Sequence, residues 1–233
     1  MDLTLFDAYN LRARFSVAVL YALPFIVDVV LLDYVSGILP TAILTFALVA
    51  LCQVAMGLVR DAGKKKTDNN SNRAADLLAL ESNLPPLTKR RYYRKLAAME
   101  PEFAPFATLL DNPDQLSREE VSALCQTAIR WLRGKTRDNK TFGLLKEENI
   151  NYGFRRNLYA LRVPGILCNL TALAGLLYRE SFFTQPTLCA IAQPPVFLHL
   201  AMLLYLWCAV TEKSVDTASK RYADTLLETI DLL

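Results

Sequence analysis

Four long stretches of the chain are almost free of charge, and nearly all charged residues lie outside them. A helix needs roughly 20 apolar residues to cross a bilayer, whereas helices of soluble cores mix apolar and polar residues every few positions. The pattern therefore predicts four transmembrane helices. Their apolar stretches are Phe15–Leu32, Ile38–Val59, Val163–Tyr178 and Leu188–Val210.

The spacing of these stretches predicts two helical hairpins separated by a helical insert. Short connections join the spans within each pair, and residues 181–193 form either an outer loop or a re-entrant segment. Pro194 and Pro195 suit a first helical turn, so the fourth helix is expected to start there. We expect an all-α membrane protein with an N-terminal segment and first hairpin (1–59), a cytoplasmic helical domain (60–157), a second hairpin (158–210) and a C-terminal helix (211–233).

The distribution of Lys and Arg predicts the orientation. Of 26 such residues, 20 lie within 60–162, two precede the first span, three follow the fourth, and one lies in 179–187. Cytoplasmic loops of membrane proteins carry this excess of positive charge. We expect a multi-pass protein of the plasma (inner) membrane with both termini and the long insert in the cytoplasm.

Helix signals recur through the insert and the tail. Helices are expected over 73–82, 88–99, 117–133 and 139–161, the third opened by a capping box of Ser117 and Glu120 and the last continuing into the third span as one rod. The tail extends the fourth helix with an apolar stripe that needs a partner: the 73–161 helices, a second subunit, or both. The stripe consists of Val215, Ala218, Tyr222, Leu226 and Ile230.

Nothing in the sequence indicates an enzyme. The only histidine, His199, lies inside the fourth span, and no nucleotide-binding loop, nucleophile motif or zinc motif occurs. The five cysteines have no metal-ligand spacing and are expected to be buried thiols. We therefore expect no catalytic residue, metal or cofactor.

Four polar residues lie inside the predicted spans. Asp28 and His199 fall at similar depth in the outer half of the bilayer, and Gln53 and Asn169 fall at similar depth nearer the inner face. Ionisable groups within a membrane are expensive unless they face partners or water. Two interpretations stay open: a polar site lining a bundle or oligomeric pore, and hydrogen bonds that pack the helices.

The densest basic run lies in the insert, where 60–157 carries 19 Lys and Arg against 13 Asp and Glu. Such charge near a membrane attracts anionic lipid; the alternative is a nucleotide or nucleic acid, with Tyr92 or Tyr93 stacking on a base. The candidate residues are Lys89, Arg90, Arg91, Tyr92, Arg94 and Lys95.

The stretch just before the third span is dense in specific groups. On a helix, Glu148, Tyr152 and Arg155 could link along one face, and Gly153 would permit close approach of another helix. Together with Arg156, these residues suit an element that couples the insert to the third span. Membrane anchoring by Arg and Tyr at the interface is the alternative.

The layout of hairpin, helical insert, hairpin and amphipathic tail, with the segment ENINYGFRRNL at 148–158, resembles the four-transmembrane pore-forming effectors that accompany bacterial nucleotide-second-messenger synthases in antiphage defence. The resemblance implies a homo-oligomer that senses a cytoplasmic signal or protein partner and makes the membrane leaky. Two other functions stay open: a non-conducting anchor or scaffold that recruits a cytoplasmic partner, and a small channel or transporter unrelated to defence.

Overall fold

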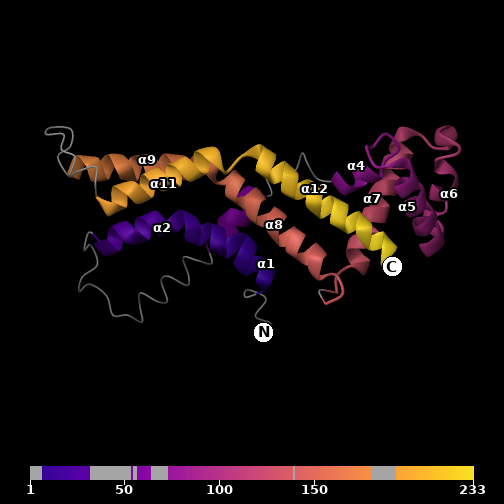
Figure 1. The fold of residues 1–233 in the computed structure, drawn as a ribbon, viewed down its shortest axis with the longest axis horizontal. Coiled ribbons are helices and arrows are strands. Elements are labelled where there is room, and N and C mark those ends of the chain that lie inside the picture. Colours follow the sequence, from indigo (N-terminus) through magenta and orange to yellow (C-terminus); the bar gives the residue numbers. More distant parts are fainter. Residues whose placement is uncertain (1–6, 32–53, 55–56, 64–72, 139, 180–192) are drawn as a thin grey trace. The chain divides into compact units, whose positions relative to one another are not determined.

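The computed structural model describes residues 7–31, 54, 57–63, 73–138, 140–179 and 193–233. Most of the predicted second span, with Gln53, and most of the predicted outer loop at 181–193 lie outside these residues. Within them every regular element is a helix and no strand occurs, which confirms the all-α class (Figure 1). The elements are α1 (Ala8–Asn10), η2 (Leu11–Phe15), α2 (Ser16–Leu31), α4 (Arg73–Leu78), α5 (Pro86–Met99), η4 (Pro101–Phe103), α6 (Phe106–Leu109), η5 (Pro113–Gln115), α7 (Arg118–Lys135), α8 (Gly143–Ala160), α9 (Arg162–Arg179), α11 (Pro194–Cys208), α12 (Glu212–Glu228) and η6 (Thr229–Asp231).

The chain divides into two compact units. Unit 1 combines Met1–Asp68 with Ile150–Val215, and unit 2 combines Asn69–Asn149 with Asp216–Leu233. The boundaries differ from those expected: α8 changes unit near residue 150 instead of 157, and most of the tail joins the helices of the insert. Two helices, α8 and α12, therefore each begin in one unit and end in the other.

In unit 1, α11 packs against both α9 and α2 (Figure 1). The buried apolar cluster of unit 1 is small, so most of the apolar side chains of these helices do not belong to it. Its buried members are Val17, Val59, Leu158, Met202, Leu206 and Val210.

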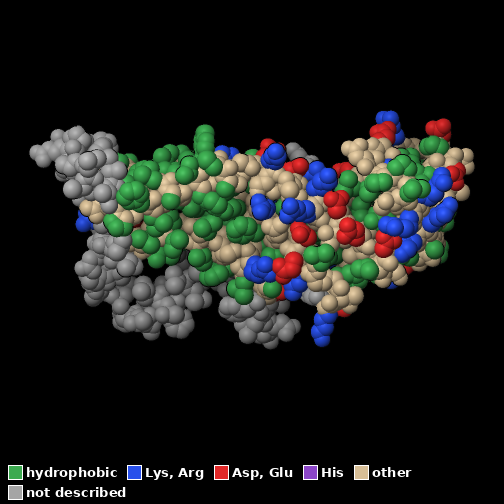
Figure 2. Space-filling model, in the orientation of Figure 1, with side chains coloured by type: hydrophobic (Ala, Val, Ile, Leu, Met, Phe, Trp, Pro, Cys, Tyr) green, Lys and Arg blue, Asp and Glu red, His purple; other side chains and the backbone are tan. Residues whose placement is uncertain are grey.

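The outer surface of unit 1 is apolar. Of the exposed large hydrophobic side chains among the described residues, all but Leu87, Leu144, Leu232 and Leu233 belong to this unit. On the face in Figure 2, hydrophobic side chains cover α9 and α11. Exposed apolar patches of this extent mark surfaces that contact lipid or protein rather than water.

One described helix, Ala8–Asp28, is long and apolar enough to cross a membrane by itself. Two helix pairs also pass this test when each bent pair counts as one span, which gives up to three candidate spans in the described residues. The pairs are α8 with α9 and α11 with α12, the latter including η6.

The expected continuous rod from the insert into the third span is wrong, because α8 and α9 meet at an angle of 53°. Pro164 lies in the first turn of α9 and has no N–H to donate to the carbonyl of Ala160, so the regular helical ladder breaks there. Nearby, the Tyr21 hydroxyl donates to the Leu158 carbonyl at 2.9 Å. A side chain from α2 thus stabilises the bend.

The fourth span and the tail are likewise not one straight helix, because they are bent by 60°. The fourth helix begins at Pro194, as predicted, and ends at Cys208. Thr211 then caps the first turn of α12: its hydroxyl accepts from the Ser214 N–H at 3.3 Å. A capping Thr begins a new helix direction instead of extending the old one.

Unit 2 has a conventional hydrophobic core. The capping box of Ser117 and Glu120 is present at the start of α7, as predicted. The core includes Leu226 and Ile230 from the tail, so the tail's apolar stripe finds its partner within the same chain. Buried Tyr93 donates its hydroxyl to the Leu78 carbonyl at 2.6 Å, and burial raises the pKa of that phenol.

We expect Leu226→Ala to destabilise unit 2 by about 2–5 kcal/mol, because Leu226 is fully buried and its truncation leaves a cavity. Leu233→Ala in the same tail removes a side chain that is 48% exposed, and it serves as the matched control. Denaturant unfolding in detergent can be followed through Trp131 in a Trp207→Phe background, since the chain has only these two tryptophans. Equal stabilities of the two variants would show that the tail does not belong to this core.

Candidate functional site

Three polar side chains meet between the apolar helices of unit 1. His199 of α11 contacts Asp28 of α2 through Nε2–Oδ2 at 2.8 Å and Asn169 of α9 through Nδ1–Oδ1 at 2.7 Å. His199 and Asn169 are fully buried, and the Asp28 side chain is 14% exposed. One polar cluster thus joins α2, α9 and α11.

The hydrogen-bond partners determine the histidine tautomer. The amide nitrogen of Asn169 donates to the Gly165 carbonyl at 2.8 Å, so its amide oxygen faces His199. An amide oxygen can only accept, and the Nδ1 of His199 must therefore carry a hydrogen. Because Nδ1 is bonded to Asn169, Nε2 is the ring nitrogen that faces Asp28.

The 2.8 Å contact between Nε2 of His199 and Oδ2 of Asp28 is a hydrogen bond when one proton lies between the two atoms. If it resides on Nε2, an imidazolium faces a carboxylate; if it resides on Asp28, a neutral imidazole accepts from a carboxylic acid. Both arrangements are neutral overall, which limits the desolvation penalty of burying the pair.

The cluster has an apolar wall and one open position. The ring of Phe25, one turn before Asp28, packs edge-on against the imidazole with centroids 5.3 Å apart. The second carboxylate oxygen of Asp28 is buried and has no hydrogen-bond partner among the described residues. A buried acceptor without a partner is unfavourable, so this oxygen is the point at which a water molecule or another polar group would join the cluster.

The structure brings Asp28 and His199 together, as their similar depths indicated, and it adds Asn169 to the same cluster. Asn169 was expected nearer the inner face, opposite Gln53, which lies outside the described residues. Depth counting assumes straight helices perpendicular to the bilayer, and the bend before α9 violates that assumption. Sequence reasoning therefore identified the three residues but not their common contact.

A second set of contacts holds the N-terminal segment against α8. The ring of Tyr9 lies so close to Gly153 that an added Cβ would approach its hydroxyl oxygen at 2.5 Å, so a larger residue at 153 would displace the Tyr9 side chain. One turn later, buried Asn157 donates to the Ala13 carbonyl at 2.8 Å, within the π-helix η2. Asn157 was not singled out from sequence, although it belongs to the segment 148–158.

The charged residues of this segment take different partners from those expected. Arg155 donates to Asn151 at 3.2 Å and to Ser214 at 2.5 Å, while Arg156 lies over the Tyr152 ring with 5.6 Å to the centroid. One carboxylate oxygen of Glu148 is buried without a hydrogen-bond partner among the described residues. The link from Arg155 to Ser214 ties α8 to the start of α12, so the segment connects helices within unit 1.

For Lys89 and Tyr92 the structure corrects the predicted anion-binding run. The ammonium of Lys89 is buried and donates to the carbonyls of Leu80 and Ser82 at 2.8 and 3.2 Å, and burial lowers its pKa. Tyr92 and Tyr93 are 4% and 1% exposed, so neither ring can stack on a base. These side chains belong to the core of unit 2.

The remaining cations of the run differ in their availability. Arg90 pairs with Asp111 at 3.3 Å, while Arg91 and Lys95 pair with Asp231 at 2.8 and 3.2 Å. Arg94 is exposed and has no ion pair among the described residues. Asp231 of η6 thus pairs with two cations of α5.

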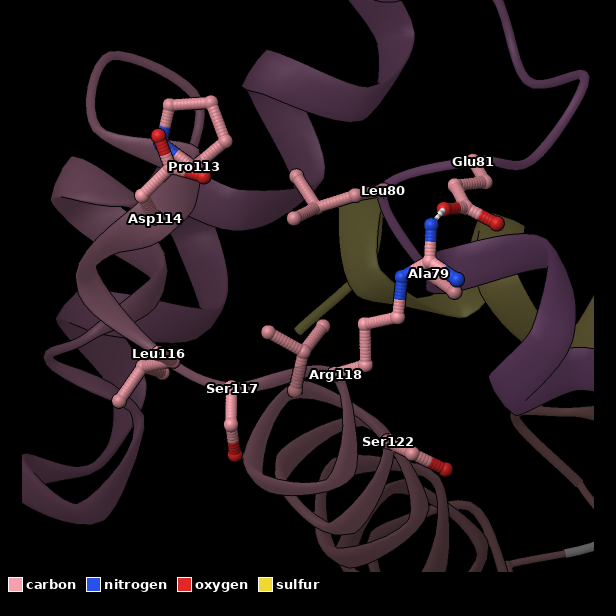
Figure 3. A pocket seen from close by; sticks show the side chains of 10 residues that line it. Ala79, Leu80, Glu81, Pro113, Asp114, Leu116, Ser117, Arg118 and Ser122 are labelled. Atoms are coloured by element: carbon pink, nitrogen blue, oxygen red, sulfur yellow. Dashed lines mark ion pairs between the residues drawn. The ribbon is translucent and has the colours of Figure 1, made fainter.

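A cavity of about 740 Å³ opens at the start of α7 (Figure 3). Its one lining cation, Arg118, pairs with Glu81 at 2.7 Å, and its Ser117 hydroxyl accepts from the Glu120 N–H within the capping box. Because these groups already have partners within the protein, the cavity offers an incoming ligand little free polar chemistry.

Comparison of the chain with protein-family models, curated proteins and solved structures gives no match. In the described residues, no group of His, Cys, Asp and Glu side chains is arranged to hold a metal ion. Function is therefore inferred from the residues of this chain.

We expect Asp28 and His199 to be energetically coupled. Asp28→Leu leaves a buried imidazole nitrogen unpaired and His199→Leu leaves a buried carboxyl unpaired, at about 1–3 kcal/mol or more each. The double variant removes both groups, so it should be at least about 1 kcal/mol more stable than the sum of the single effects implies. Unfolding of the purified protein in detergent measures the four free energies of the cycle.

Cys168→Ala provides the control for this cycle, because Cys168 neighbours Asn169 in sequence but is exposed on α9. Its effect should simply add to that of Asp28→Leu. Additive effects of Asp28→Leu and His199→Leu would show that the pair is not coupled.

Proposed function

We propose that this chain is an integral membrane effector of prokaryotic antiviral defence that responds to a cytoplasmic signal and permeabilises the membrane as a homo-oligomer. The observation that carries the proposal is the cluster of Asp28, Asn169 and His199, buried among helices whose outer surface is apolar. The resemblance in layout to four-transmembrane defence effectors supports the biological role.

Lipid is the partner that best fits the outer surface of unit 1. Along α9, the charged residues Arg162 and Arg179 lie only at the two ends, while Val163, Leu167 and Leu170 are about half exposed or more. Such a helix presents apolar side chains to hydrocarbon and charged ends to the headgroups. The strong bias of Lys and Arg supports four spans with both termini in the cytoplasm.

The buried cluster supplies polar chemistry where packing alone would favour apolar residues. An ionisable pair inside a bundle typically marks an ion, proton or substrate path. Its position between three helices means that separating any two of them would expose hydrogen-bonding groups. One chain contributes too few helices to enclose a wide aqueous path, so the conducting state requires several copies around a symmetry axis.

Signal transfer can run along α8. This helix begins in unit 2, passes into unit 1, and there contacts Tyr9 through Gly153 and Ala13 through Asn157. It ends at the bend before α9, which holds Asn169. A ligand or partner that shifts α8 would thereby change the contacts of the polar cluster. A switch of this kind needs an element with two stable arrangements, and we propose that the cluster is this element.

We expect cells that express the chain with its neighbouring genes to depolarise on phage infection, and Asp28→Ala to reduce depolarisation about tenfold or more. Losing a hydrogen bond to a charged group removes about 1.5–3 kcal/mol, which shifts a closed–open equilibrium by that factor. A voltage-sensitive dye measures the potential, with Cys168→Ala as the control. Unchanged potential on infection would exclude permeabilisation.

The same assay separates the proposal from a non-conducting anchor. Replacing the spans with unrelated apolar helices should abolish depolarisation and protection if the spans conduct. An anchor would retain protection after the exchange, because only recruitment to the membrane matters for it.

The proposed four-span topology can be tested by the location of the C-terminus, which it places in the cytoplasm. A fluorescent protein fused after Leu233 should fold and fluoresce, whereas alkaline phosphatase at the same position should stay inactive because it needs oxidising conditions for its disulfides. Fusions within 181–187, between the predicted third and fourth spans, should give the opposite result. Active phosphatase at the C-terminus would contradict this topology.

A further inference from the structure

A smaller cavity in unit 2, of about 270 Å³, differs from the one at the start of α7 in its charge. Arg133 and Arg137 line it from the end of α7, and Lys146 lines it from the start of α8. No Asp or Glu belongs to its lining. Three cations therefore face one concave site without a compensating carboxylate.

These cations have no ion pair within the part of unit 2 that the structure describes. The nearest acid after Arg137, Asp138, is engaged in the loop: it accepts from the Lys140 N–H at 3.1 Å and the Thr141 hydroxyl at 2.6 Å. These bonds lower the pKa of Asp138. Its carboxylate is therefore used locally and does not line the cavity.

The position of Lys146 is unfavourable without an anion. The N-terminal end of a helix carries partial positive charge, and acidic residues usually stand there. The first turn of α8 has no acidic residue and Lys146 follows directly. Arg133, by contrast, suits the last turn of α7, so the helix dipole explains Arg133 but not Lys146.

The rest of the lining fits a small molecule with an uncharged part. Asn149 adds an amide beside Lys146, and Phe142, Leu145 and Tyr222 form apolar walls. Pockets for drug-sized ligands start at about 300 Å³, so the volume limits the ligand to a small one. Guanidinium groups bind phosphate through paired N–H donors, and lysine adds a point charge.

From these observations we infer that the cavity between α7, α8 and α12 binds the phosphate group of a small phosphorylated molecule or of a lipid headgroup, with Arg133, Arg137 and Lys146 as its ligands. The inference deepens the proposed function, on which it rests for the role of the bound molecule as the signal. The site lies on α8 and α12, the two helices that continue into unit 1.

Inorganic pyrophosphate is the first probe, titrated calorimetrically into the full-length protein in detergent at low salt. We expect saturable binding that weakens at least about tenfold in the double variant Arg133→Gln/Arg137→Gln, since each lost charged hydrogen bond contributes about tenfold or more. Arg94→Gln is the matched control: it also removes an exposed, unpaired arginine of unit 2, but outside the cavity. Binding should be unchanged in this control.

Vesicles with and without phosphatidic acid test the lipid source. Loss of their binding in the double variant but not in Arg94→Gln would assign the site to a lipid phosphate. Absence of saturable binding to both probes, or equal weakening in the double variant and Arg94→Gln, would overturn the inference. Because binding is measured without any membrane current, its failure is distinguishable from failure of permeabilisation.

Discussion

The packing of unit 1 depends on one constraint: a buried polar side chain among apolar helices is unfavourable unless it finds hydrogen-bond partners within the protein. His199 is fully buried, away from bulk water. The imidazole of His199 therefore uses both nitrogens, one toward Asn169 and one toward Asp28. Each bond comes from a different helix, so satisfying one side chain also fixes how three helices pack.

The same constraint explains the bend between α8 and α9. Pro164 prevents one backbone hydrogen bond, and the carbonyl of Leu158 is served by the Tyr21 hydroxyl. That bond requires the Tyr21 ring to lie against Gly165, where an added Cβ would come within 2.0 Å of the ring. Pro164 thus removes the N–H that would serve the Ala160 carbonyl, and Gly165 leaves space for the Tyr21 ring, which donates to the Leu158 carbonyl.

Sequence patterns predicted the main helices of the insert and identified the polar residues of the buried cluster, because helix rise and hydrophobic periodicity are local properties. The fixed rise per residue was enough to predict a similar depth for Asp28 and His199, and the capping box at Ser117 depends on four consecutive residues. The bends were missed at residues 161 and 209–211, although Pro164 was visible in the sequence. A proline in a first turn is compatible with both a straight start and a bend, and packing against Tyr21 selects the bend.

The basic run shows why charge density alone was misleading. Lys89, Tyr92, Tyr93 and Leu96 are buried, and their three-to-four spacing is that of a core-facing helical stripe. Leu87, in contrast, is 82% exposed on the same helix. The long apolar stem of Lys89 allows its ammonium to reach the carbonyls of Leu80 and Ser82, in the turn that follows α4. A buried lysine of this kind contributes to the fold rather than to ligand binding.

The cations that remain available line the smaller cavity of unit 2. Lys146 and Asn149 belong to α8, and Tyr222 belongs to α12. Both helices continue into unit 1, where Arg155 of α8 donates to Ser214 of α12. A ligand that contacts both α8 and α12 at the cavity would favour one arrangement of these two helices. The hydrogen bond from Arg155 to Ser214 restrains the same two helices in unit 1. Because α8 leads directly to the bend at Pro164, that bias would act on α9 and hence on the hydrogen bond between Asn169 and His199.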